Sequence, residues 1–196
     1  MPNWAFVDYK IKGKKEHLKD LKSILEKMSN EDDKSFTVKN DFGNCWLGNL
    51  VTSLGGDWNK VPCRGQLNDY YVSEDDDGNI RMLQLILEVA WSEDIELRDF
   101  IKSHYNNEIE IYYYQEEPGC EVYQTNSFEE FPTRYILELE NIGQLESEDL
   151  SDVAENLSRY LDIEVEPDLD KIQEVLDDYQ QDAEIYAGLH PIELSE

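Results

Sequence analysis

A pair of strand-like segments around residue 77 constrains the fold of this chain more than any other feature. Residues 80–90 place Leu83, Leu85 and Leu87 at alternate positions, and Asp76-Asp77-Gly78-Asn79 separates them from a second segment at 65–74. Alternation with a period of two is typical of a strand with one buried face, and an Asp-Gly pair tolerates the positive φ angles of a tight turn. The pattern predicts a β-hairpin. A calcium loop over Ser73–Gln84 is not favoured, because its twelfth position lacks the bidentate glutamate.

Strand and helix patterns flank the hairpin on both sides. Residues 4–12 alternate as a strand, and residues 15–28 carry an apolar stripe at helical spacing. Ser92 is the predicted N-cap of a second amphipathic helix. Further segments are expected as strands at 35–39, 108–115 and 119–125 and as helices at 45–54 and 93–105. The order predicts an α+β chain with a ferredoxin-like split βαβ fold, its helices on one face of an antiparallel sheet.

The last seventy residues form a second, acidic α+β part. A strand at 134–140 precedes a glycine-containing loop and a helix with Ser147 as its predicted N-cap. A short strand at 162–166 and a helix after Asp168 follow, and Gly188 and Pro191 end that helix. The sequence therefore predicts a ferredoxin-like domain at 1–126 and an acidic extension at 127–196 that packs on it.

The charge of the chain is strongly uneven. The whole sequence has 45 acidic and 17 basic residues, but residues 1–67 carry eleven Lys/Arg and nine Asp/Glu. A net charge of −28 argues against direct binding to nucleic acid or an anionic membrane, while 22 aromatic residues favour a folded chain. The six lysines between Lys10 and Lys22 fit either a solvated face or a docking patch for an acidic partner, including a second copy of the chain.

The sequence contains no convincing catalytic or metal-binding motif. Three widely spaced cysteines argue against a disulfide framework and favour a reducing cytoplasm. No cysteine pair has zinc spacing, and no glycine-rich phosphate loop is present. Cys45 and His104 could in principle act as nucleophile and base, but a core thiol and a helix-face histidine are favoured. We expect no catalytic residue, no metal, no cofactor and no enzymatic activity.

Several short segments resemble the YubB-like family of ferredoxin-fold proteins from bacterial plasmids, phages and integrated mobile elements. The similarity covers about residues 1–126 and implies a mobile-element source, but no activity. The segments that carry it are Met1-Pro2-Asn3-Trp4, Ile11-Lys12-Gly13, Cys45-Trp46-Leu47-Gly48, Gly55-Gly56-Asp57-Trp58, Ala90-Trp91-Ser92 and Tyr113–Tyr123.

A candidate interaction surface combines aromatic and acidic residues. Tyr112 and Tyr114 alternate on one strand face beside Glu110. Glutamates around these rings oppose RNA stacking, so packing against the C-terminal helices is favoured, with protein binding next. Trp58, Asp177 and Asp178 complete the candidate set.

These features predict a non-enzymatic binding or regulatory protein whose acidic surface binds a basic protein partner. Mimicry of DNA and neutralisation of a toxin, as an immunity protein does, are specific versions of this hypothesis. The alternative is a small-ligand domain or enzyme with a site between the two parts, lined by Trp46, Trp58 and Cys63. A third interpretation, adaptation to molar salt, conflicts with the lysine-rich first helix.

Overall fold

The chain divides into two compact units, residues 1–122 and 123–196. The computed structural model describes residues 3–30, 32–33, 42–183 and 186–195. The predicted strand at 35–39 lies outside these ranges. The predicted domain boundary, between residues 126 and 127, lies four residues after the boundary between the units.

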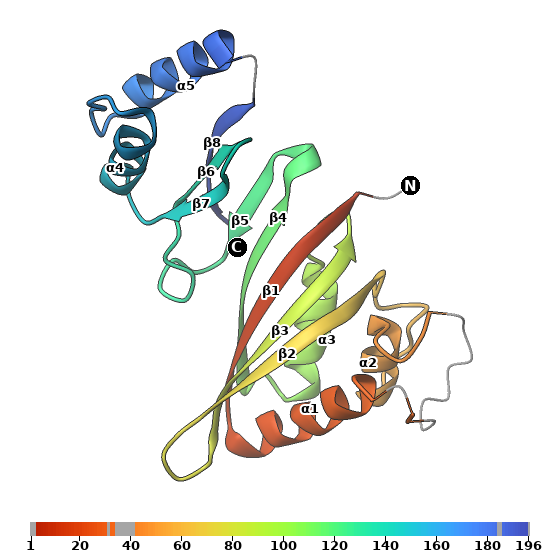
Figure 1. Cartoon of the computed structure of the whole chain (residues 1–196). Coiled ribbons are helices and arrows are strands. Elements are labelled where there is room, and N and C mark those ends of the chain that lie inside the picture. The colour runs from red at the N-terminus through yellow and green to blue at the C-terminus, as the bar shows by residue number, and fades with distance from the viewer. Residues whose placement is uncertain (1–2, 31, 34–41, 184–185, 196) are drawn as a thin grey trace. The chain divides into compact units, whose positions relative to one another are not determined.

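The first unit is built around four antiparallel strands. Their order in the sheet is β2–β3–β1–β4, and each adjacent pair runs antiparallel. The strands are β1 (Trp4–Gly13), β2 (Gly65–Glu74), β3 (Ile80–Ala90) and β4 (Ile109–Glu117). The helices of this unit are α1 (Lys15–Met28), α2 (Leu47–Ser53) and α3 (Ile95–His104). Figure 1 shows α1 following β1 and α3 following β3. The α+β class is therefore confirmed.

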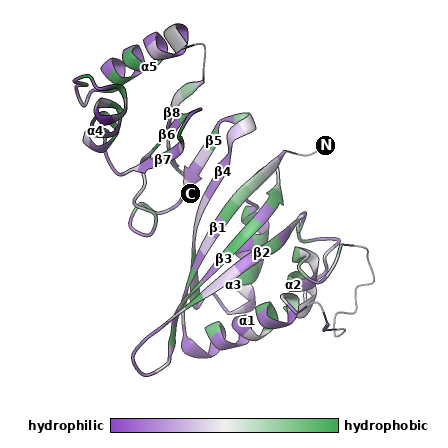
Figure 2. Cartoon of the chain, in the orientation of Figure 1, coloured by the Kyte–Doolittle hydropathy of each residue, from purple (hydrophilic) through white to green (hydrophobic). Residues whose placement is uncertain are grey.

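One face of this sheet and the helices share a single hydrophobic core. The buried side chains of β1 and β3 alternate along each strand, and they pack in one cluster with Leu21 and Leu25 of α1 and Leu97 of α3. In Figure 2 hydrophobic and hydrophilic residues alternate along α1, in line with its one buried stripe. The opposite face of the sheet, called the open face below, carries mostly half-buried polar and aromatic residues.

The predicted hairpin is confirmed. Strands β2 and β3 pair directly, with Tyr71 opposite Gln84, and a turn around Gly78 joins them. Asp75 accepts hydrogen bonds from the backbone N–H groups of Asp77 and Asn79 at 3.0 and 2.8 Å. The carboxylate is thereby used in an Asx-type turn.

The second unit is a small α+β structure of its own. Two helices, α4 (Leu150–Leu161) and α5 (Leu169–Ala183), contribute to one core with a three-stranded antiparallel sheet ordered β7–β6–β8. Its strands are β6 (Tyr135–Leu139), β7 (Gly143–Ser147) and β8 (Ala187–Pro191). A short strand β9 (Glu193–Leu194) pairs in parallel with β5 (Val122–Thr125), which follows a 3₁₀ turn at Pro118–Cys120.

Four sequence predictions are wrong: two helix N-caps, one short strand and the end of the last helix. Asp94, not Ser92, caps α3, and Asp149, not Ser147, caps α4, because each aspartate accepts from two N–H groups of the first turn. Residues 162–166 contain no strand. The last helix ends at Ala183, and Gly188 and Pro191 lie in strand β8. The predicted cap at Asp168 is confirmed by its bonds to the N–H groups of Asp170 and Lys171.

Candidate functional site

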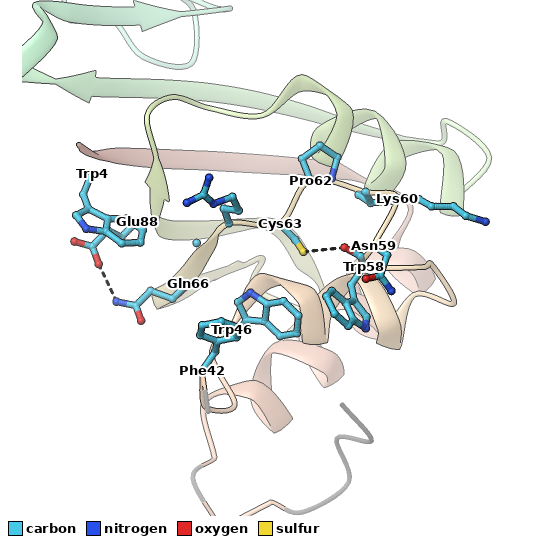
Figure 3. Close-up of a pocket in the computed structure, with 13 residues that line it drawn as sticks. Trp4, Phe42, Trp46, Trp58, Asn59, Lys60, Pro62, Cys63, Gln66 and Glu88 are labelled. Atoms are coloured by element: carbon cyan, nitrogen blue, oxygen red, sulfur yellow. Dashed lines mark hydrogen bonds between the residues drawn. The ribbon is translucent and has the colours of Figure 1, made fainter. Parts of the chain in front are cut away.

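A pocket of about 600 Å³ opens in the first unit beside the start of β2. Figure 3 shows that it is formed by the loop between α2 and β2, with residues of β1 and β3 at one end. The volume falls within the range of small-molecule sites. The lining residues are Trp4, Phe42, Trp46, Trp58, Asn59, Lys60, Val61, Pro62, Cys63, Arg64, Gly65, Gln66 and Glu88.

Three aromatic rings form a continuous run along this pocket. The ring centroids of Trp46 and Trp58 lie 5.4 Å apart in an edge-to-face arrangement, and Phe42 lies 5.3 Å from Trp46. Trp46 is 8% exposed and anchors the run, whereas Trp58 is 41% exposed and Trp4, elsewhere on the lining, is 51% exposed. Exposed tryptophans are unusual on a soluble surface, and their grouping around one pocket is typical of a binding site.

The position of Trp46 depends on a glycine in helix α2. A Cβ atom on Gly48 would collide with the six-membered ring of the indole, so the absence of a side chain leaves room for that ring. The adjacent backbone is fixed by a hydrogen bond of 2.8 Å from the Leu67 N–H to the Cys45 carbonyl oxygen. This hydrogen bond, together with an isolated antiparallel bridge between Trp46 and Gln66, holds the segment 45–48 against the start of β2.

The pocket has few polar side chains, and they differ in whether they already have a partner. Gln66 donates a hydrogen bond of 2.8 Å to Glu88, and Figure 3 shows this pair beside Trp4. Lys60 makes a long, exposed contact of 3.6 Å with Asp57. Arg64 is exposed, and its side chain has no ion pair or hydrogen bond within the described part of the chain. The pocket therefore offers one uncommitted cation beside an aromatic wall.

Cys63 lines the pocket but is poorly suited to act as a nucleophile. Burial raises the pKa of its thiol above the ordinary value of 9.0, and the negative charge of Asp94 adds to the shift. The thiol lies 3.7 Å from the Trp58 carbonyl oxygen, to which it donates. A cysteine of this kind stays protonated at neutral pH, while the nucleophilic form is the thiolate.

The second unit carries a dense set of exposed carboxylates. Residues 149–178 contain eleven acidic and two basic residues, and all eleven acids are exposed. The two cations, Arg159 and Lys171, pair with Glu155 and Glu174 at 2.6 and 2.7 Å. Nine carboxylates are thus left without an ion pair in the described structure. We refer to residues 149–178 as the acidic helix pair.

The open face of the first sheet carries three of the predicted interaction residues. Tyr112 and Tyr114 are half-buried on β4, and their hydroxyls donate to Glu110 at 2.6 Å and to Glu116 at 3.1 Å. Lys12 lies 5.8 Å from the centroid of the Tyr112 ring. These acidic and basic neighbours give the face a mixed charge.

The six predicted interaction residues therefore belong to three places in the molecule. Glu110, Tyr112 and Tyr114 share the open face of β4, and Trp58 lies in the aromatic pocket. Asp177 and Asp178 are exposed on α5, within the acidic helix pair. The predicted grouping of Trp46, Trp58 and Cys63 is found, but the pocket that they line lies wholly within the first unit and not between the two parts.

A buried polar cluster at the start of α3 is absent from the sequence predictions. Tyr9 donates a hydrogen bond of 2.6 Å to Glu93, and Arg98 forms an ion pair of 3.2 Å with the same carboxylate. Desolvation raises the pKa of Glu93, although Tyr9 and Arg98 act in the opposite direction. Side chains this deeply buried, at 7% and 4% exposure for Arg98 and Glu93, serve to fix α3 on the sheet.

Other classes of site find no support in the described residues. These residues contain no group of three or more His, Cys, Asp or Glu side chains placed to hold a metal ion. Among them, no helix combines the length and the apolar character needed to cross a lipid bilayer. Cys45 donates its thiol to the Met28 carbonyl oxygen, and His104 packs edge-on against Tyr105, which are structural contacts.

No protein-family model, curated protein or solved structure that was compared with the chain matches it.

Proposed function

We propose that this protein is a non-enzymatic binding or regulatory protein that presents the acidic helix pair to a basic protein partner. The observation that carries the proposal is the set of nine exposed carboxylates without a paired cation on residues 149–178. Such a surface raises the rate of encounter with a basic partner and rejects acidic ones. Carboxylates spaced over two folded helices also suit mimicry of DNA phosphates or neutralisation of a basic nuclease.

The family and the setting are part of the same proposal. The first unit supports a ferredoxin-like assignment, because its strands follow the order β2–β3–β1–β4 and a helix follows both β1 and β3. The short segments that resemble the YubB-like family fall within this unit, apart from Tyr123 at the end of the last segment. We therefore propose a bacterial mobile-element protein that acts in the cytoplasm, and self-association through the lysine-rich first helix remains part of the proposal.

The test compares two pairs of adjacent exposed aspartates. Wild-type protein is immobilised on a resin and incubated with host extract at about 50 mM salt. The bound proteins are then eluted with rising salt. D177N/D178N should bind the captured basic protein more weakly, and D76N/D77N, in the hairpin, should bind it like wild type. Equal binding by all three proteins would contradict the acidic helix pair as the interface.

A second candidate function is a small-ligand domain, and the aromatic pocket favours it. The pocket has the volume of a small-molecule site and groups three partly exposed aromatic residues, Trp4, Phe42 and Trp58, around one opening. An enzyme with its site in this pocket belongs to the same alternative, but Cys63 is poorly suited to act as its nucleophile because burial raises the pKa of the thiol. Binding of a fluorescent apolar probe, lost in Trp58→Ala, tests whether the pocket accepts a ligand.

A further inference from the structure

The aromatic pocket combines an exposed tryptophan ring with a positive charge that has no ion pair in the described structure. Trp58 keeps 41% of its surface exposed although its edge-to-face contact with Trp46 fixes its orientation. Arg64 lies in the loop that leads from the pocket into β2, with its guanidinium uncommitted in the described structure. A ring that is already held in place loses little entropy when a flat ligand stacks on it.

The charges in the pocket favour an anionic ligand over a cationic one. Its lining contains two cations, Lys60 and Arg64, and one carboxylate, Glu88. Glu88 already accepts a hydrogen bond of 2.8 Å from Gln66, which occupies one of its carboxylate oxygens. Lys60 lies 3.6 Å from Asp57, so Arg64 is the cation of the lining that remains uncommitted in the described structure.

The geometry of the rings also argues against a cage for a cation. A quaternary ammonium group is bound by aromatic faces that surround an empty centre. Here Phe42, Trp46 and Trp58 contact one another at centroid distances of 5.3 and 5.4 Å, so the space between these rings is filled. What they offer instead is a continuous wall.

From these observations we infer that the pocket binds a small planar aromatic molecule that carries a negative charge. The aromatic ring of the ligand stacks on the exposed surface of Trp58, and Arg64 pairs with the phosphate or carboxylate. Arginine suits this role because its planar guanidinium forms paired hydrogen bonds to either group. The inference rests on the second proposed function, that the pocket accepts a ligand.

Calorimetric titration with two matched pairs of probes tests the ligand class. Adenosine monophosphate and adenosine differ by a phosphate, and indole-3-acetate and indole differ by a carboxylate. We expect at least one charged probe to bind about tenfold more tightly than its uncharged partner, the size of a single charge-assisted hydrogen bond. The two arms separate a phosphate ligand from a carboxylate ligand.

Two substitutions assign the contacts, and each has a matched control. Arg64→Gln should remove the preference for the charged probe and leave the uncharged probe within about twofold of wild type. Trp58→Ala should weaken both probes of the pair by about tenfold, as loss of a stacking partner does. Arg81→Gln and Tyr71→Ala replace an exposed arginine and an exposed aromatic residue outside the pocket, and they should change neither affinity.

The outcomes separate this inference from the function on which it rests. Equal binding of charged and uncharged probes, unchanged in Arg64→Gln, would overturn the anionic ligand and leave the pocket as a site for neutral aromatics. Binding of the apolar fluorescent probe alone would overturn the ligand class but keep the pocket. Absence of binding by every probe would overturn both.

Discussion

At the scale of the residue, the pocket depends on one small side chain. Gly48→Ala would gain up to about 1 kcal/mol of helix propensity, but the added methyl group meets the Trp46 ring. Overpacking of a filled site costs about 1–3 kcal/mol, so the clash should prevail. We expect a lower free energy of unfolding in urea and an altered tryptophan emission spectrum. Ser53→Ala, at an exposed position of the same helix, should show neither change.

Asp8 offers a second test at this scale, because its carboxylate is buried on the open face of β1. Desolvation raises its pKa above the ordinary value of 3.8, although Gln84 donates a 2.7 Å hydrogen bond to one oxygen. The other oxygen has no hydrogen-bond partner among the residues that the structure describes. The folded protein therefore holds this proton more tightly than the unfolded chain. Stability from this group is present at low pH and is lost as pH rises through the raised pKa.

Asp8→Asn should remove that component of the pH dependence. Between about pH 4 and pH 7, the variant should lose less unfolding free energy than wild type and should be at least as stable at the upper limit. Urea unfolding at a series of pH values measures the difference. Asp76→Asn, at an exposed position of the hairpin, should keep the wild-type slope. A wild-type slope in Asp8→Asn would contradict the burial argument.

At the scale of the element, the start of α3 tests which residue caps the helix. Asp94 accepts from the N–H groups of Glu96 and Leu97 at 3.0 and 3.4 Å, whereas Ser92 lies outside the helix. Asp94→Ala should lower the free energy of unfolding by about 1 kcal/mol, the usual contribution of an N-cap. Ser92→Ala should change it by less than about 0.5 kcal/mol. The reverse order of effects would favour the cap expected from the sequence.

Periodicity predicts the hairpin strands and α1 well, because each of them buries one face. The hairpin strands begin and end at the predicted residues, and α1 does so too. Helix caps are harder to predict: Ser92 and Asp94 are both good capping residues, and only the path of the chain after β3 decides between them. Trp91, at φ 78°, marks the sharp change of direction there.

The second unit was predicted less well for a related reason. Strands β7 and β8 are five residues long, and they include glycine and proline residues that signal loops in a sequence. Their strand conformation comes from pairing with the two edges of β6, which is a tertiary contact. The pocket illustrates the same limit: Trp46, Trp58 and Cys63 could be selected as a group from the sequence, but not Arg64 or the role of Gly48.

At the scale of the whole molecule, the two units have different charge. Residues 123–196 carry 21 acidic and three basic residues, whereas two lysines of the cluster at 10–22 in the first unit pair with carboxylates. Lys14 pairs with Glu108 and Lys22 with Glu26, each at 2.5 Å. Local neutralisation of this kind favours the solvated-face interpretation of the lysine cluster. Nine carboxylates of the acidic helix pair lack such an ion pair in the described structure, so their repulsion acts within the second unit.

This repulsion predicts how stability depends on salt. The Debye length falls from about 30 Å at 0.01 M salt to about 8 Å at 0.15 M, so moderate salt screens neighbouring helices from one another. The melting temperature should therefore rise over this range and change much less above about 0.5 M. Replacement of unpaired carboxylates, as in D177N/D178N, should reduce the rise, and D76N/D77N serves as the control. A melting temperature that keeps rising into molar salt would instead support adaptation to a saline environment and contradict screening as the cause.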